Sequence, residues 1–132
     1  MRTHRCSREV AASPERIARI VCDAARLPEW NPALVEVEAS GRALERRRYR
    51  MRAIRGLRGH LVYTLISPER IEMTMQVQGL REEGSWLLEP LGDRTRVEHG
   101  FSHTGLLGRL LSPAFQDVAE LRLDRLAERA AA

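Results

Sequence analysis

The feature that most constrains the fold is a long stretch, from about residue 34 to Gly105, in which apolar and polar residues alternate with period two. In residues 71–77 the odd positions are apolar and the even positions are polar, which is typical of a strand with one buried face. Residues 95–103 alternate in the same way, so their odd positions are expected to share one inward face. Consecutive short strands joined by tight turns pair antiparallel. The predicted strands are residues 4–12, 34–39, 44–54, 61–66, 71–77, 84–89 and 95–103, with Val35 and Val37 on one face of the second.

Helical signals lie on both sides of this stretch. Ser13 is a suitable N-cap and Pro14 suits the first helical position, which predicts a helix ending near residues 25–26. The two prolines of residues 27–32 allow only a helical turn and a bend. Ser112-Pro113 predicts a kink or a new N-cap before a long C-terminal helix. One face of this helix would hold Phe115, Val118, Ala119, Arg122 and Leu126. The sequence therefore predicts an α+β fold: an antiparallel sheet of about seven strands curved around a long C-terminal helix, with two short helices after the first strand.

Composition narrows the class of protein. The 132 residues favour one domain over residues 1–132, and a hydrophobic content of 43% is ordinary for a globular protein. No apolar run could span a membrane, and residues 1–10 lack the apolar core of a signal peptide, so a cytoplasmic location is expected. All 22 basic residues are arginine, which codon usage in a GC-rich genome explains more simply than selection at a site. Cys6 and Cys22 match no metal or redox spacing and are expected to be buried thiols.

Three stretches carry a resemblance to a known superfamily. Residues 28–32 read Pro-Glu-Trp-Asn-Pro, residues 84–97 resemble a penultimate hairpin, and residues 106–126 resemble a gripping helix. From residue 3 to about 128 the chain resembles the START-like (SRPBCC) superfamily with the helix-grip fold, and in particular its polyketide cyclase/dehydrase-like members. The resemblance implies a cavity between sheet and last helix that binds a hydrophobic, polyketide- or lipid-like molecule. It is compatible with a carrier, a regulatory protein or an enzyme of aldol cyclisation or dehydration, because a shared fold does not decide function.

The sequence offers few groups for catalysis. It contains no phosphate-binding loop, metalloprotease motif or serine-hydrolase elbow, so no cofactor and no metal site are expected. His99 and His103 lie four residues apart on one strand, and their Cα atoms would be ~13 Å apart at ~3.3 Å per residue, too far to share a metal ion. The candidate catalytic residues are His99, which could move a proton, and Tyr63, which could polarise a carbonyl. A structural hydrogen bond explains Tyr63 equally well, and His99 could instead be a hydrogen-bonded histidine near a strand end.

The candidate ligand-binding residues are apolar and aromatic side chains on the inward faces, together with one histidine. Methionine is flexible and polarisable, so it suits a wall that adapts to apolar ligands. An ordinary packed core would use the same residue types, and the sequence leaves both roles open. The set is Trp30, Met51, Met73, Met75, Val97, Phe101, His103, Phe115 and Val118.

A second function follows from the arginine-rich segment 46–58. Period two places its arginines on one strand face, where Glu36, Glu38 and Glu72 on neighbouring strands are expected to pair with them. Without such pairing, a non-catalytic interaction or regulatory module could use this strand to dock an acidic partner. Nucleic acid is disfavoured, because no exposed aromatic residues are interleaved with the charge. The sequence leaves open whether the protein forms a homodimer. The arginines of this face are Arg46, Arg48, Arg50 and Arg52.

Overall fold

The computed structural model of the chain describes residues 2–111, 115 and 117–132. Its strands form one antiparallel sheet in the order β1-β7-β6-β5-β4-β3-β2, which confirms the predicted α+β, helix-grip architecture. The strands are β1 (Arg2–Val10), β2 (Leu34–Val37), β3 (Arg48–Ala53), β4 (Arg58–Ile66), β5 (Arg70–Val77), β6 (Leu80–Leu91) and β7 (Arg94–Thr104).

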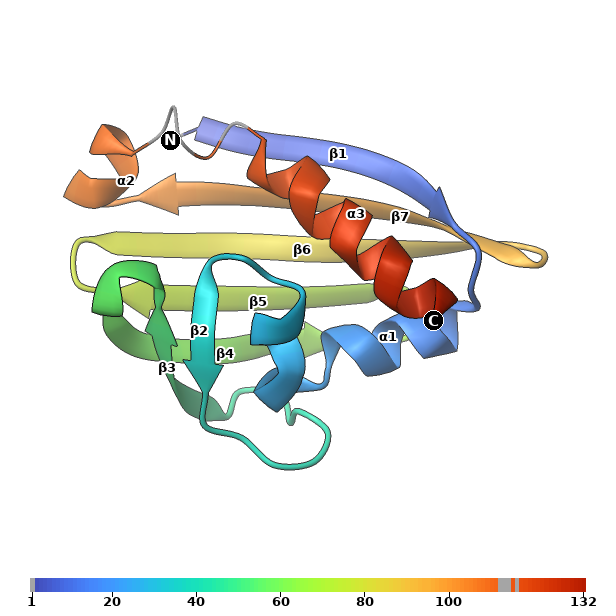
Figure 1. Cartoon of the computed structure of the whole chain (residues 1–132), viewed down its shortest axis with the longest axis horizontal. Helices are drawn as coiled ribbons and strands as arrows, with labels where there is room; N and C mark the ends of the chain where they lie inside the picture. Colours follow the sequence, from blue (N-terminus) through green and yellow to red (C-terminus); the bar gives the residue numbers. More distant parts are fainter. Residues whose placement is uncertain (1, 112–114, 116) are drawn as a thin grey trace.

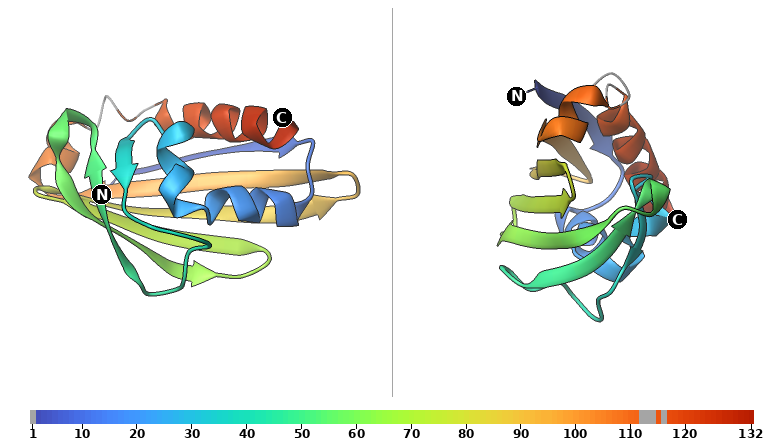
Figure 2. Two further views of the ribbon diagram at one scale, coloured as in Figure 1. Left: turned by 60° about the horizontal axis from the view of Figure 1, so that its bottom comes forward. Right: turned by 90° about the vertical axis from the view of Figure 1, so that its left-hand side faces the viewer.

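The helices lie on one face of this sheet (Figures 1 and 2). Helix α3 crosses the sheet diagonally and packs on β1 and β7, with α1 beside it. The short helices η2 and α2 lie at the opposite end of the sheet from α1. The helices are α1 (Pro14–Val21), η1 (Ala24–Glu29), η2 (Ile54–Gly56), α2 (Leu106–Leu110) and α3 (Val118–Ala131).

Local chemistry explains where the first helices begin and end. The Ser13 hydroxyl accepts a hydrogen bond from the Arg16 backbone N–H at 3.2 Å, and Pro14 occupies the first turn, as predicted. Helix α1 ends at Val21, earlier than predicted, and η1 takes up the bend with Pro28 inside it. The Arg16 guanidinium donates to the carbonyl of Ala130 at 2.8 Å, which ties α1 to the end of α3.

The sheet differs from the sequence prediction at one strand face and in several strand bounds. The prediction that Val35 and Val37 share a face is wrong: a register shift between Leu34 and Glu36 leaves Val35 47% exposed while Val37 is buried. Strand β6 extends over residues 80–91 rather than 84–89, because it pairs along most of its length with β7. The predicted kink at Ser112-Pro113 lies outside the described residues.

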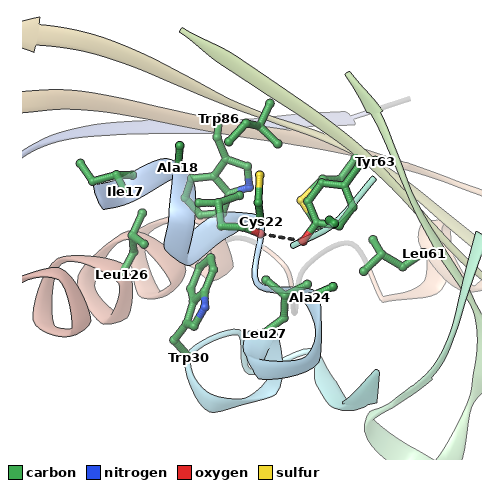
Figure 3. Close-up of a cluster of buried hydrophobic side chains, with 14 of the residues drawn as sticks. Ile17, Ala18, Cys22, Ala24, Leu27, Trp30, Leu61, Tyr63, Trp86 and Leu126 are labelled. Carbon is green, nitrogen blue, oxygen red and sulfur yellow. Dashed lines mark hydrogen bonds between the residues drawn. The ribbon is translucent and has the colours of Figure 1, made fainter. Parts of the chain in front are cut away.

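The inward face of the sheet follows the predicted alternation. The odd positions of residues 95–103 and of residues 71–77 are all buried under the helices. Between α1, η1 and the sheet lies a dense cluster of side chains that includes Ile17, Leu27, Trp30 and Leu126 (Figure 3). This packing holds α3 over the sheet and so fixes the position of the side chains that α3 carries.

Candidate functional site

A cavity of about 270 Å³ lies between the sheet, the η2 loop and the first turns of α3. Its walls come mainly from Met51 on β3, Met75 and Val77 on β5, and Val118 on α3. These side chains are apolar and unbranched or small, so they leave space that a larger aromatic residue would fill. A concave, mostly apolar space with a few polar groups is the usual form of a small-molecule site.

A larger groove of about 720 Å³ lies on the outside of the molecule, between α1, η1 and the last turns of α3. Its walls are mostly charged, with Arg16, Arg19, Arg125 and Glu128 among them. Several of these charges already have partners: Arg129 pairs with Glu29 at 2.6 Å, and Arg16 binds the end of α3. The smaller, apolar cavity is therefore the better candidate site for an organic ligand.

The η2 loop and α3 provide the entrance to the cavity. Ile54 of η2 and Leu121 of α3 line the cavity and are 50% and 39% exposed. Arg55, which also lines it, adopts φ +64°, a left-handed conformation uncommon for a residue with a side chain. Together with the following Gly56 at φ +73°, it turns the chain back sharply from β3 into β4. The entrance is therefore an apolar rim on a tight turn.

The structure divides the predicted ligand-binding residues into two groups. Five of the nine line the cavity: Met51, Met75, His103, Phe115 and Val118. The other four are buried in the core and do not line it: Trp30, Met73, Val97 and Phe101. We call the cavity region the hollow half of the core, and the region around Trp30, Tyr63, Trp86 and His99 the filled half.

Tyr63, a predicted catalytic residue, lies in the filled half. Its hydroxyl donates a 2.6 Å hydrogen bond to the carbonyl of Val21, and its side chain is fully buried (Figure 3). Burial raises the pKa of this hydroxyl well above its ordinary value, so it remains protonated. Tyr63 does not line the cavity. In this position the hydroxyl links β4 to the end of α1.

His99, the other predicted catalytic residue, also lies in the filled half, with both ring nitrogens engaged. Nδ1 donates to the carbonyl oxygen of Ser85 at 3.0 Å, and Nε2 lies 3.3 Å from a guanidinium nitrogen of Arg122. The ring stacks on Trp86 with centroids 3.7 Å apart. Burial, and then the charge of Arg122, lower the pKa of His99 to about 3, so the ring is neutral. Its contacts orient Arg122 and leave no nitrogen for a ligand.

A buried ion pair between β6 and α3 forms the polar wall of the cavity. The Arg122 guanidinium donates to both carboxylate oxygens of Glu82, Nη1 to Oε2 at 2.9 Å and Nη2 to Oε1 at 3.0 Å. Its Nε donates to Asn31 Oδ1 at 3.2 Å, so the bend after η1 also positions it. Arg122 is 2% exposed and Glu82 8%. A two-pronged, hydrogen-bonded geometry of this kind is what a charge pair needs to persist in a core.

His103 completes this wall. It faces Glu82 across the β6–β7 ladder, and its Nε2 lies 2.8 Å from Glu82 Oε1. Its ring stacks on Phe115 with centroids 4.0 Å apart. Burial alone would raise the pKa of Glu82, but the charge of Arg122 and hydrogen bonds from His103 and Arg122 outweigh it and lower the pKa to about 2. Glu82 is therefore a carboxylate, and His103 donates its Nε2 proton to it.

Sequence reasoning missed Glu82 and assigned Arg122 only to a helix face. A signal for Glu82 was present: it occupies an inward position of β6, in phase with the buried residues Trp86 and Leu88. An acidic residue on a buried strand face needs a basic partner. Arg122, on the buried face of the last helix, was the matching signal.

The arginine side chains of β3 project from the outer face of the sheet, away from the cavity. The prediction that Arg46 shares this strand is wrong: it lies in a turn before β3 at φ +64°, and residues 54–56 form η2 rather than strand. Arg48 and Arg50 are exposed, and β4 places His60 opposite Arg50 and Arg58 opposite Arg52. The expected ion pairs with Glu36, Glu38 and Glu72 are not formed between described residues; Glu72 pairs with Arg70 on its own strand instead. Long exposed side chains gain little from such pairs, because water screens the charge and ordering costs entropy.

Metal-binding clusters and membrane-spanning helices are both absent from the described part of the chain. Within it, no three histidine, cysteine, aspartate or glutamate side chains gather closely enough to hold a metal ion. None of the helices there has the length and apolar character needed to cross a membrane.

The chain matches a known protein family. A family model described as "Polyketide cyclase / dehydrase and lipid transport" matches residues 1–131. No curated protein matches the chain significantly.

Solved structures show the same fold at low identity. A START superfamily protein from Mycobacterium smegmatis is 23% identical, with a TM-score of 0.76 over 98% of this chain and 97% of that one. A protein from Chromobacterium violaceum is also 23% identical, with a TM-score of 0.75 over 100% and 99% of the two chains. A protein from Thermus thermophilus is 24% identical, with a TM-score of 0.72 over 98% and 97%. The chain has the START-like fold, and it belongs to the polyketide cyclase/dehydrase and lipid transport family.

Proposed function

We propose that this protein binds a hydrophobic small molecule, polyketide- or lipid-like in character, in the cavity lined by Met51, Met75 and Val118. The observation that carries the proposal is an apolar space under α3 with an exposed apolar rim at Ile54 and Leu121. Burying apolar ligand surface there would supply most of the binding free energy, at about 25 cal/mol for each Å² removed from water. The family's description, which includes lipid transport, agrees with this function.

The cavity volume limits the size of the ligand. An apolar cavity of about 150 Å³ holds one benzene ring, and drug-sized ligands occupy pockets of about 300–1,000 Å³. The volume of about 270 Å³ therefore suits a molecule of about two fused rings, or an equally compact chain. A long polyketide chain would need α3 or the η2 loop to move outward.

The structure supports ligand binding better than it supports catalysis by Tyr63 and His99, the two predicted catalytic residues. The hydroxyl of Tyr63 and both ring nitrogens of His99 are engaged in the filled half. Cyclisation or dehydration in this cavity would instead draw on His103, which lines the cavity and is oriented by Glu82. A histidine held by a carboxylate is a common arrangement for moving a proton.

The test is equilibrium dialysis with naphthalene, a neutral two-ring probe without polar groups, supported by native mass spectrometry of the freshly purified protein. We expect wild type to bind naphthalene, and Val118→Trp to weaken binding about tenfold or more, because the indole would occupy the space beside α3. Glu120→Trp, an exposed position on the same helix, is the matched control and should bind like wild type. Equal binding by wild type and a folded Val118→Trp variant would place the probe elsewhere and reject the proposal.

A further inference from the structure

The buried end of the cavity is polar, and the formal charges of Glu82 and Arg122 there cancel, whereas Arg55 lines the cavity at its exposed rim. Glu82, His103 and Arg122 line this end, whereas Met51, Met75, Val77 and Val118 surround the rest. Arg122 carries a positive charge, and Glu82 carries a negative charge held 2.9–3.0 Å away on two hydrogen bonds. The Arg122 guanidinium that a ligand meets is therefore already neutralised by the Glu82 carboxylate.

The remaining hydrogen-bonding capacity of this end can be counted. A carboxylate offers about four lone-pair sites. Glu82 uses three of them, for Arg122 Nη1, Arg122 Nη2 and His103 Nε2, which leaves one. His103 faces Glu82 through Nε2, and its other ring nitrogen, Nδ1, is buried and has no hydrogen-bond partner among the described residues.

Arg122 has one donor left over. Its guanidinium has five N–H bonds. Four of them point to acceptors: Asn31 Oδ1, the two oxygens of Glu82, and His99 Nε2. The polar end thus combines one unused acceptor site on Glu82 and one unused donor on Arg122 with the unpartnered Nδ1 of His103.

Among simple polar groups, a hydroxyl matches this combination, because it donates one hydrogen bond and accepts two. A carboxylate is acceptor-only and would bring a second negative charge beside Glu82 in a buried place. Like charges in a low-dielectric site repel strongly, and Arg122 is already neutralised. A group without polar atoms would leave the remaining donors and acceptors unsatisfied.

Building on the proposed function, we propose that the natural ligand is a neutral compact molecule whose polar end is a hydroxyl, as in a phenol, an enol or an alcohol, seated against Glu82 and Arg122. The site selects against fatty-acid-like and other carboxylate ligands of the same size. Glu82 is the residue that sets this preference, because it supplies the charge that a carboxylate would oppose.

Three probes of nearly equal size test this preference without any mutation: naphthalene, 2-naphthol and 2-naphthoate, each in equilibrium dialysis with wild type at neutral pH. We expect 2-naphthol to bind about threefold to tenfold more tightly than naphthalene, through the hydrogen bonds it adds. We expect 2-naphthoate to bind at least about tenfold more weakly than 2-naphthol.

Failures of the two proposals give different results. If naphthalene does not bind, the proposed function fails, and this inference fails with it. If naphthalene binds but 2-naphthoate binds as tightly as 2-naphthol, the selection against carboxylates is overturned while the binding function stands. A 2-naphthol affinity no higher than that of naphthalene would likewise overturn the preference for a hydroxyl and leave the binding function intact.

The variant Glu82→Gln tests whether Glu82 sets the preference for a hydroxyl over a carboxylate. Glutamine keeps the shape of the side chain and removes the charge, so the ratio of 2-naphthoate to 2-naphthol affinity should shift at least about tenfold toward the carboxylate, which then meets Arg122 alone. Glu83→Gln, the exposed next residue of β6, removes one negative charge from the outer face and should leave the ratio unchanged. An unchanged ratio in a folded Glu82→Gln protein would overturn the role of Glu82.

Discussion

The filled and hollow halves of the core lie under the same sheet and the same helix, yet they are packed differently. In the filled half, aromatic rings touch: Trp30 meets Trp86 edge-on at 5.4 Å, and Trp86 stacks on His99. In the hollow half, methionine and valine side chains leave about 270 Å³ empty. The comparison shows how helix α3 can both stabilise the core and cover a cavity. Dense packing at one end holds α3 in place, so that the cavity at the other end can stay open.

The buried ion pair lies on the boundary between the two halves. Arg122 contacts Asn31 and His99 on the filled side, and it lines the cavity with Glu82 on the hollow side. Its guanidinium carbon also lies 4.9 Å from the centroid of the Phe101 ring, close enough for a cation–π contact. The polar wall of the cavity is therefore anchored in the packed part of the core.

The largest effect is expected when this boundary is broken. Arg122→Met keeps much of the side-chain volume but leaves the Glu82 carboxylate buried without its partner. Breaking a buried ion pair in this way costs about 3–5 kcal/mol of the free energy of unfolding. Urea denaturation of wild type and variant at neutral pH measures this loss.

A rescue experiment separates charge from packing. The double variant Arg122→Met, Glu82→Met removes both charges, and hydrophobic replacement of a buried pair is often close to neutral. We expect it to recover most of the lost stability. A double variant as unstable as Arg122→Met alone would show that Arg122 acts through its contacts with Asn31 and His99 rather than by neutralising Glu82.

Much of the fold could be predicted from the sequence, because it depends on local patterns. Period-two alternation identified the buried faces of residues 71–77 and 95–103, and Ser13-Pro14 located the start of α1. Val35 was misplaced because a bulge shifts the alternation without any mark in the sequence.

The site was harder to predict, because a cavity is a property of elements far apart in the sequence. Met73 and Met75 follow one pattern on one strand, and both are buried, yet only Met75 lines the cavity. The difference depends on where η2 and α3 lie above the strand. For the same reason, the sequence could not decide that His99 is enclosed by Trp86 and Ser85 while His103 reaches the cavity.

These two methionines give the next test of the comparison. Met73→Ala in the packed core should cost about 2–4 kcal/mol in the free energy of unfolding, within the usual range for truncating a buried methionine. Met75→Ala should cost less, because part of its surface faces empty space and loses no contacts there. The same urea denaturation measures both changes.

Naphthalene affinity should respond more to Met75→Ala than to Met73→Ala, the reverse of the order expected for stability. Met75→Ala alters the cavity wall, so its affinity for naphthalene should change severalfold, whereas Met73→Ala should bind like wild type. Equal losses of stability and equal affinities for the two variants would contradict the division into a filled and a hollow half.

The smallest expected effect concerns pH and belongs to the filled half. His99 is neutral in the folded protein because burial and Arg122 lower its pKa to about 3, whereas a histidine in the unfolded chain titrates near its ordinary pKa of 6.5. Between these values the unfolded chain binds one more proton than the folded chain, so stability falls as the pH decreases below about 6.5, by about 1 kcal/mol for each pH unit. Glu82 adds to this loss only at lower pH, between its ordinary pKa of 4.5 and its folded-state pKa of about 2, where the unfolded chain takes up the proton first.

Unfolding measured by urea between pH 6.5 and 5 should therefore have a shallower pH dependence in His99→Gln than in wild type, whereas His60→Gln, on the outer face of β4, should keep the wild-type slope. An unchanged slope in His99→Gln would show that His99 takes up a proton within the fold, which would require the filled half to open around Trp86 in acid.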